Sequence, residues 1–165
     1  DIIGDVLQKF EMLQSNPNSY KGIPTGFKRL DKMTHGLQPG ALIVLAARPG
    51  MGKTSFALNI ALHVAAYEKQ PVAIFSLEMS KEQLVNRLLC CEGLIPSDRM
   101  RTGKLEEDDW GKLAEAMSKL SDAPLYIDDT PGISISELRS KCRKMKLENN
   151  LGSPWASKIR LFHSF

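Results

Sequence analysis

The stretch Ala47–Phe56, ARPGMGKTSF, has the residue types and the spacing to bind a phosphate group. An anion cradle needs backbone N–H groups that turn towards one point, a helix N-terminus behind them, and a lysine that reaches the terminal phosphates. Gly50 and Gly52 relieve the steric limits on such a turn. In this pattern Lys53 contacts the β- and γ-phosphates and the Thr54 hydroxyl holds Mg²⁺. The stretch therefore predicts a nucleotide site that works with Mg²⁺.

Ala47 stands where the usual pattern G-x-x-x-x-G-K-[ST] begins with glycine. Alanine is tolerable there if its φ angle is negative, and the following proline stiffens the turn. The alternative is a glycine-rich turn with an incidental lysine. The position of the motif, after an apolar run and before a helical one, favours a nucleotide site. The residues expected to line it are Arg48, Pro49, Gly50, Met51, Gly52, Lys53, Thr54 and Ser55.

The elements around this loop predict an α/β fold. LIVLAA, residues 42–47, follows a glycine and reads as a strand buried on both faces. Apolar residues then recur at helical spacing from Lys53 to about Glu68, and PVAIFSLEM, residues 71–79, reads as a second buried strand. Strand, helix and strand in this order form a βαβ unit with parallel strands. We therefore expect a parallel sheet with flanking helices.

Further elements follow from periodicity and capping signals. An amphipathic helix is predicted over residues 2–14, and APLYIDD, residues 123–129, predicts a third strand. S-x-x-Q at Ser80 and S-x-x-E at Ser134 each predict a capping box that begins a helix. Residues 106–120 predict another helix, whose expected inward residues are Trp110, Leu113, Ala114, Met117 and Leu120.

Glu78 lies at the predicted carboxyl end of the second strand. In doubly wound sheets the carboxyl ends of neighbouring strands line the ligand crevice. A carboxylate there can polarise an attacking water as general base. Equally, it can be a strand-end residue that caps Lys81 or the following helix. Position alone leaves both interpretations open.

Length, composition and charge limit the number of domains and the classes of partner that we expect. The 165 residues, 42% of them hydrophobic, suffice for one domain with one core. A net charge of +3 is compatible with a polyanionic partner without being typical of a dedicated nucleic-acid coat. The three cysteines lack metal-ligand spacing, and no apolar run approaches the length of a membrane span. We expect a reducing, cytoplasmic environment and no membrane contact.

The residues from Gly22 to Gly152 resemble the RecA-like motor domain of replicative DNA helicases of the DnaB type. The resemblance rests on segments that occur in the family's order and spacing, and alanine is usual there at the first position of the loop. The segments are GIPTGFKRLDKMTHGLQPGALIVLAARPGMGKTSFALNIA, VAIFSLEMS, RTGKL, LYIDDTPGIS and ELRSKCRKMK.

This resemblance implies an ATPase that works at subunit interfaces of a hexameric ring and pulls single-stranded DNA through it. It implies Glu78 as the catalytic glutamate, with Lys53 also in the catalytic machinery, ATP as the nucleotide, and Thr54 as the contact to Mg²⁺. Primase and a helicase loader are further implied partners. Residues 1–20 resemble a linker helix and its connector, and residues 21–152 the N-terminal portion of the ATPase domain.

Residues 153–165 resemble no segment of these helicases, so we leave this tail unassigned. The Walker B strand, the DNA-binding loops and the arginine finger of the family pattern would lie beyond residue 152, and we expect a domain that is incomplete at the C-terminus. Such a sheet would expose an unpaired edge unless Ile159 to Phe162 form a substitute strand.

PLYIDD could also be a Walker B motif in which Asp128 or Asp129 holds Mg²⁺ through water. We favour a turn, Asp-Thr-Pro-Gly, at the end of an edge strand. The basic side chains around Leu138 and Met145 fit a solvated face better than a DNA contact. Two functions stay open: an ATP-driven DNA motor, or a catalytically silent nucleotide-binding module of the helicase ring.

Overall fold

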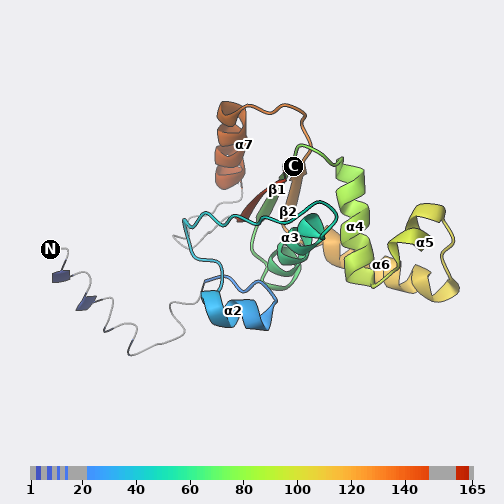
Figure 1. The fold of residues 1–165 in the computed structure, drawn as a ribbon, viewed down its shortest axis with the longest axis horizontal. Coiled ribbons are helices and arrows are strands. Elements are labelled where there is room, and N and C mark those ends of the chain that lie inside the picture. The colour runs from blue at the N-terminus through green and yellow to red at the C-terminus, as the bar shows by residue number, and fades with distance from the viewer. Residues whose placement is uncertain are drawn as a thin grey trace. The chain divides into compact units, whose positions relative to one another are not determined.

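The computed structural model describes residues 22–148 and 159–163, together with residues 3, 4, 7, 8, 11 and 14 (Figure 1). The chain forms two compact units, Asp1–Leu42 and Ile43–Phe165. The helix predicted over residues 2–14 falls mostly outside the described residues, and the predicted domain boundaries at residues 20 and 152 stay predictions.

The described part of the first unit is a closed loop around one short helix. Helix α2, Lys28–Thr34, lies between Ile23 and Leu37, which form an isolated antiparallel bridge. Thr25 is 1% exposed, and both its N–H and its hydroxyl donate to Asp31 Oδ1, at 2.9 and 2.7 Å. This carboxylate therefore ties the segment before α2 to the helix itself.

A three-stranded parallel sheet organises the second unit. Strand β1, Val72–Ser76, is central, with β2, Leu125–Asp128, on one side and β3, Ile159–His163, on the other. Every residue of β1 is buried, as a central strand of a covered parallel sheet should be. The parallel sheet with flanking helices predicted from the sequence is confirmed, and β3 is the substitute strand considered there.

Helix α7, Ile135–Glu148, covers one face of the sheet. Its Cys142 is 5% exposed and forms a core cluster with Ala73 and Phe75 of β1, against which Leu138 and Met145 also pack. Because side chains alternate along a strand, Val72 and Ile74 point to the opposite face. The predicted cap is present, since the Glu137 N–H donates to Ser134 Oγ at 3.2 Å.

Helices from the first half of the second unit lie on the other side of the sheet (Figure 1). Helix α3, Lys53–Leu62, continues into the π-helical turn η2, His63–Tyr67, as the predicted helix to about Glu68 requires. Helix α4, Lys81–Gly93, begins with the predicted capping box between Ser80 and Gln83. Helices α5, Ser97–Thr102, and α6, Glu107–Ser121, lead back to β2.

The predicted inner face of α6 is wrong in part. Trp110 is 61% and Met117 53% exposed, whereas Ala116 and Asp109 are buried. Asp109 can be buried because its carboxylate accepts from the Glu106 N–H at 3.0 Å and from Arg99 Nη1 at 3.2 Å. A buried charge needs such partners, and the face of α6 that carries Asp109 and Ala116 is the buried one.

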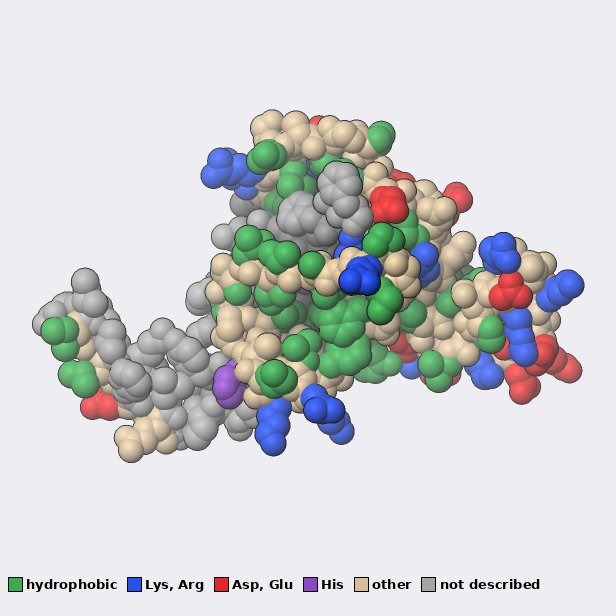
Figure 2. Space-filling view, in the orientation of Figure 1, with side chains coloured by type: hydrophobic (Ala, Val, Ile, Leu, Met, Phe, Trp, Pro, Cys, Tyr) green, Lys and Arg blue, Asp and Glu red, His purple; other side chains and the backbone are tan. Residues whose placement is uncertain are grey.

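The strand predicted over residues 42–47 is also wrong. These residues have no regular secondary structure and are exposed, among them Ile43 at 61% and Val44 at 80%. Apolar character indicates burial but does not supply a pairing partner, and among the described residues the sheet consists of β2, β1 and β3. Hydrophobic side chains gather over the middle of the face drawn in Figure 2, which this segment crosses in Figure 1.

Candidate nucleotide-binding site

In the glycine-rich loop that follows this segment, residues with positive φ alternate with residues that lack it. Gly50 has φ 77° and Gly52 has φ 81°, whereas Met51 is not among the residues with positive φ and Lys53 begins α3. A turn closes the loop's start, because the Met51 N–H donates to the Arg48 carbonyl at 3.2 Å. Alternating left- and right-handed residues turn successive N–H groups towards one concave side, which is the geometry of an anion-binding nest.

The loop has the room that a phosphate group needs. A Cβ added at Gly50 or Gly52 would meet nothing within 4 Å, and residues 47–52 are all exposed. Lys53, Thr54 and Ser55, in the first turn of α3, are half-buried. A hydroxyl beside phosphate oxygens suits Mg²⁺, which usually takes one or two protein ligands and keeps its other positions for water and phosphate. The residues present therefore fit a nucleotide with Mg²⁺.

Glu78 lies in a bend, residues 77–79, between the end of β1 and the start of α4. The strand ends at Ser76, three residues before the predicted end at residue 79, and the Glu78 side chain is exposed. Ser76 is 2% exposed, and its Oγ accepts from the Met79 N–H at 3.0 Å. The bend is therefore tied back to the strand that precedes it.

The carboxylates of Asp128 and Asp129 accept hydrogen bonds from neighbouring parts of the chain. These bonds support the turn interpretation and not the Walker B interpretation. Asp128 Oδ1 accepts from the Thr130 N–H and hydroxyl, at 3.0 and 2.6 Å, and its Oδ2 accepts from Lys141 Nζ at 2.7 Å. Asp129 Oδ2 accepts from the Lys81 N–H at 2.8 Å. These bonds fix the turn after β2 to helices α7 and α4.

We expect Asp128 to make stability depend on pH. Burial alone would raise the pKa of this carboxyl, but hydrogen bonds from Lys141 and Thr130 outweigh it and lower the pKa to about 2. Because this value lies below the ordinary value of about 4, the stabilisation is complete above pH 4 and is lost as the pH falls from 4 to 2. Asp128→Asn should lower the free energy of unfolding by about 1–3 kcal/mol at pH 7.

Urea unfolding at pH 7, 4 and 2.5 checks this. The difference between wild type and Asp128→Asn should shrink towards zero at the lowest pH. Asp98→Asn is the control, because the Asp98–Arg101 ion pair joins side chains that are 76% and 80% exposed and should matter little. A difference for Asp128→Asn that stays constant from pH 7 to 2.5 would contradict the assignment.

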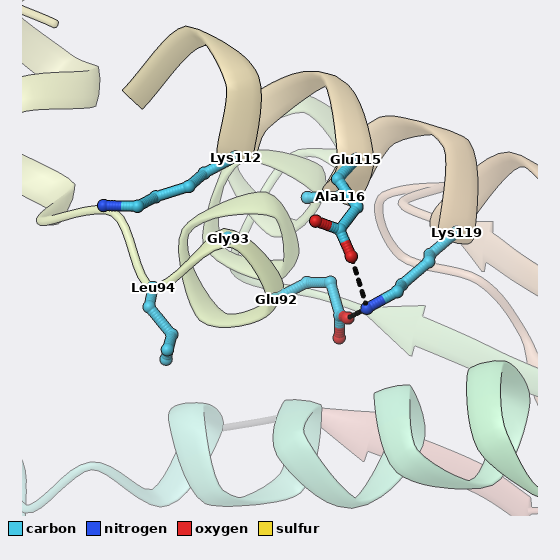
Figure 3. Close-up of a pocket in the computed structure, with 7 residues that line it drawn as sticks. All are labelled: Glu92, Gly93, Leu94, Lys112, Glu115, Ala116 and Lys119. Atoms are coloured by element: carbon cyan, nitrogen blue, oxygen red, sulfur yellow. Dashed lines mark hydrogen bonds and ion pairs between the residues drawn. The ribbon is translucent and has the colours of Figure 1, made fainter. Parts of the chain in front are cut away.

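A separate hollow of about 260 Å³ lies between the C-terminal end of α4 and helix α6 (Figure 3). Three of its charged side chains pair with one another, since Lys119 Nζ lies 2.9 Å from Glu92 Oε1 and 3.2 Å from Glu115 Oε1. None of the predicted site residues lines it. We assign it no role in nucleotide binding.

Comparison with known proteins decides the family. Residues 22–154 match the model of the DnaB-like helicase C-terminal domain. The chain belongs to this family. It is 55% identical over 152 residues to the replicative DNA helicase DnaB of Geobacillus stearothermophilus, and 54% identical over 152 residues to the replicative DNA helicase DnaC of Bacillus subtilis. Each alignment covers 92% of the chain but 34% of the relative, so the chain spans about a third of these helicases.

Solved structures agree with the DnaB-like assignment. The ATPase domain of G40P matches with a TM-score of 0.88 and 30% identity, over 100% of this chain and 57% of that one. A DnaB-like replicative helicase, whose structure was described with its interactions with primase, matches with a TM-score of 0.84 and 31% identity, over 98% of this chain and 38% of that one. The RecA-like fold predicted from the sequence is confirmed. Among the described residues, no helix is long and apolar enough to cross a membrane.

Proposed function

We propose that this DnaB-like ATPase domain binds ATP with Mg²⁺ in the loop 48–55 and hydrolyses it to drive DNA unwinding. The observation that carries the proposal is the alternation of residues with and without positive φ from Gly50 to Lys53, at the N-terminus of α3. That geometry supplies converging N–H donors and a favourable helix dipole for a triphosphate. Membership of a helicase family supplies the reason to identify the anion as ATP.

Each site residue has a role in this proposal. The loop amides hold the phosphates in place, and Lys53 places its positive charge on the terminal ones. Mg²⁺, when held by Thr54, would neutralise charge on the phosphate oxygens. Glu78 accepts a proton from the attacking water as general base, while the bend that carries it keeps the carboxylate at the end of β1.

The partners that we propose follow from the family. The relatives are named replicative DNA helicases, so single-stranded DNA at a replication fork is the proposed track and a homo-hexameric ring the proposed assembly. Primase is proposed as a partner because one structural neighbour is described with it, and a helicase loader is proposed beside it. A cytoplasmic location completes the proposal.

A second function is favoured by one observation. The segment that leads into the loop, residues 42–47, lies outside the sheet, so the loop lacks the strand that would anchor it. Nucleotide held by such a loop need not be turned over. The alternative is therefore a catalytically silent nucleotide-binding module that acts within a helicase ring.

Two measurements on the 165-residue chain separate these functions. The first is titration with a fluorescent ATP analogue, for which both functions expect binding. The second is ATP turnover with and without single-stranded DNA. Turnover that DNA stimulates identifies the motor, and binding without turnover identifies the silent module. No binding in the presence of Mg²⁺ would overturn both.

A further inference from the structure

We propose that Ser76 and Asp129 are positioning residues for Glu78: they hold the two ends of the bend that presents its carboxylate. This inference deepens the proposed function and rests on it. Neither side chain belongs to the glycine-rich loop, and neither is among the residues that the sequence indicates for catalysis. Their contacts with the bend carry the argument.

The first contact closes the bend on its strand side. Ser76 is the last residue of β1 and is 2% exposed, and its Oγ accepts from the Met79 N–H at 3.0 Å. Glu78 lies between these two partners in the chain. A buried acceptor that binds an amide three residues later fixes the direction in which the chain leaves the strand. Removing it leaves the half-buried Met79 N–H to find another partner.

The second contact fixes the helix side of the bend from another strand. Strands β1 and β2 are parallel, and Phe75 pairs with Asp128. Asp129 therefore lies beside Ser76 at the carboxyl ends of the two strands. Its Oδ2 accepts from the Lys81 N–H at 2.8 Å, and its Oδ1 lies 3.4 Å from Lys81 Nζ. This amide belongs to the first residue of α4, which has no partner within its own helix.

The two contacts differ from ordinary helix capping in one respect. Helix α4 already has its own cap, because Ser80 Oγ accepts from the Gln83 N–H and Gln83 Oε1 accepts from the Ser80 N–H. The Asp129 bond is thus an additional one, made to a residue 48 positions away in the chain. The turn that presents Asp129 is itself fixed, by the bonds of Asp128 to Thr130 and Lys141. The bend is therefore held at both ends.

Hydrogen exchange tests the geometry without any need for catalysis. In the 165-residue chain, Asp129→Ala should raise the exchange rate of the amides of residues 77–81 at least about tenfold, and Ser76→Ala should do the same for Met79. The matched control is Asp109→Ala, which removes a similar carboxylate-to-amide bond at the start of α6. It should leave residues 77–81 unchanged. Unchanged exchange at these residues in Asp129→Ala would overturn the inference.

Steady-state kinetics test the link to Glu78. They use the ATPase-active form, which is the chain itself or, if the chain is silent, residues 22–148 in place of the matching segment of a full-length relative. Asp129→Ala should lower kcat about ten- to a hundredfold with little change in KM, since a misplaced group costs rate more than affinity. Asp129→Asn keeps an oxygen acceptor and should restore most of kcat. Lys81→Ala keeps the backbone N–H and removes only the ion pair, so its kcat should stay near wild type.

The outcomes separate the inference from the function on which it rests. If Glu78→Gln has normal turnover, the proposed role of Glu78 falls and the inference falls with it. If Glu78→Gln is inactive but Asp129→Ala keeps a normal kcat, only the inference falls. A loss of kcat in Asp109→Ala equal to that in Asp129→Ala would show a general effect of stability and would also overturn it.

Discussion

Lys53→Ala should weaken ATP binding at least about thirtyfold. The loop amides and the α3 dipole supply partial charges, but Lys53 is the one full positive charge that the motif places on the terminal phosphates. Truncating one partner of a desolvated, hydrogen-bonded charge pair costs about 2–5 kcal/mol. With 1.4 kcal/mol for each factor of ten, affinity should fall at least about thirtyfold. Titration with a fluorescent ATP analogue in the presence of Mg²⁺ measures the change.

Lys104→Ala is the matched control, because Lys104 is an exposed lysine in the segment after α5. It removes the same net charge without touching the loop, and its affinity should stay within about twofold of wild type, as expected for a screened surface charge. Circular dichroism confirms that Lys53→Ala stays folded. An unchanged affinity in folded Lys53→Ala would refute the assignment of this loop as the phosphate-binding site, whatever its backbone geometry.

Local signals in the sequence predict the helices well. The capping box at Ser80 and the Ser134 cap on the Glu137 N–H depend on residues three positions apart, so the sequence alone contains the information that they need. The glycine-rich loop is similar, because only glycine adopts the positive φ angles at positions 50 and 52 without strain. These features of the fold and of the site are therefore predictable from the chain itself.

The position of each strand in the sheet is not local information. An apolar run such as LIVLAA indicates burial between two layers but says nothing of which neighbour it finds. In the structure, Ile159–His163 takes the edge of β1 that β2 leaves open. The segment at residues 42–47 pairs with none of the described strands and is exposed. Pairing depends on contacts between segments far apart in the chain, and periodicity within one segment does not contain that information.

The orientation of α6 shows a second limit. Apolar periodicity assigns Trp110 and Met117 to the core, because it assumes that carboxylates stay outside. Asp109 breaks that assumption through an ion pair with Arg99, ten residues earlier, and a bond from the Glu106 amide. Glu106 and Asp109 form a capping box in the structure, but E-x-x-D is not the usual S/T-x-x-E/Q signature, so the sequence contains no clear signal of it. The partner Arg99 could not be found from periodicity either, since it lies on another helix.

The support of the candidate site was likewise beyond sequence reasoning. The sequence indicates Glu78 but offers no reason to connect it with Asp129, because their proximity follows from the pairing of β1 with β2. The two adjacent aspartates after a strand favour a turn but also permit a magnesium ligand. The hydrogen bonds that both of them accept show that they hold the turn and its neighbouring helices together.

Glu78→Gln should separate binding from turnover. Glutamine has nearly the same shape and can still accept a hydrogen bond, but it cannot take a proton from the attacking water. Loss of a general base typically costs 10²–10⁴-fold in rate, so kcat of the ATPase-active form should fall by about that factor. The affinity for the ATP analogue should stay within about threefold, because the loop, Lys53 and Thr54 are unchanged.

The control for this substitution is Glu82→Gln, an exposed glutamate in the first turn of α4, four residues beyond Glu78. It removes the same charge from the same region of the molecule, and turnover should stay near wild type. If Glu78→Gln and Glu82→Gln lose turnover equally, the effect is one of local charge and not of proton transfer. If Glu78→Gln still hydrolyses ATP at the wild-type rate, Glu78 is a strand-end residue, and the base must be sought elsewhere in the ATPase-active form.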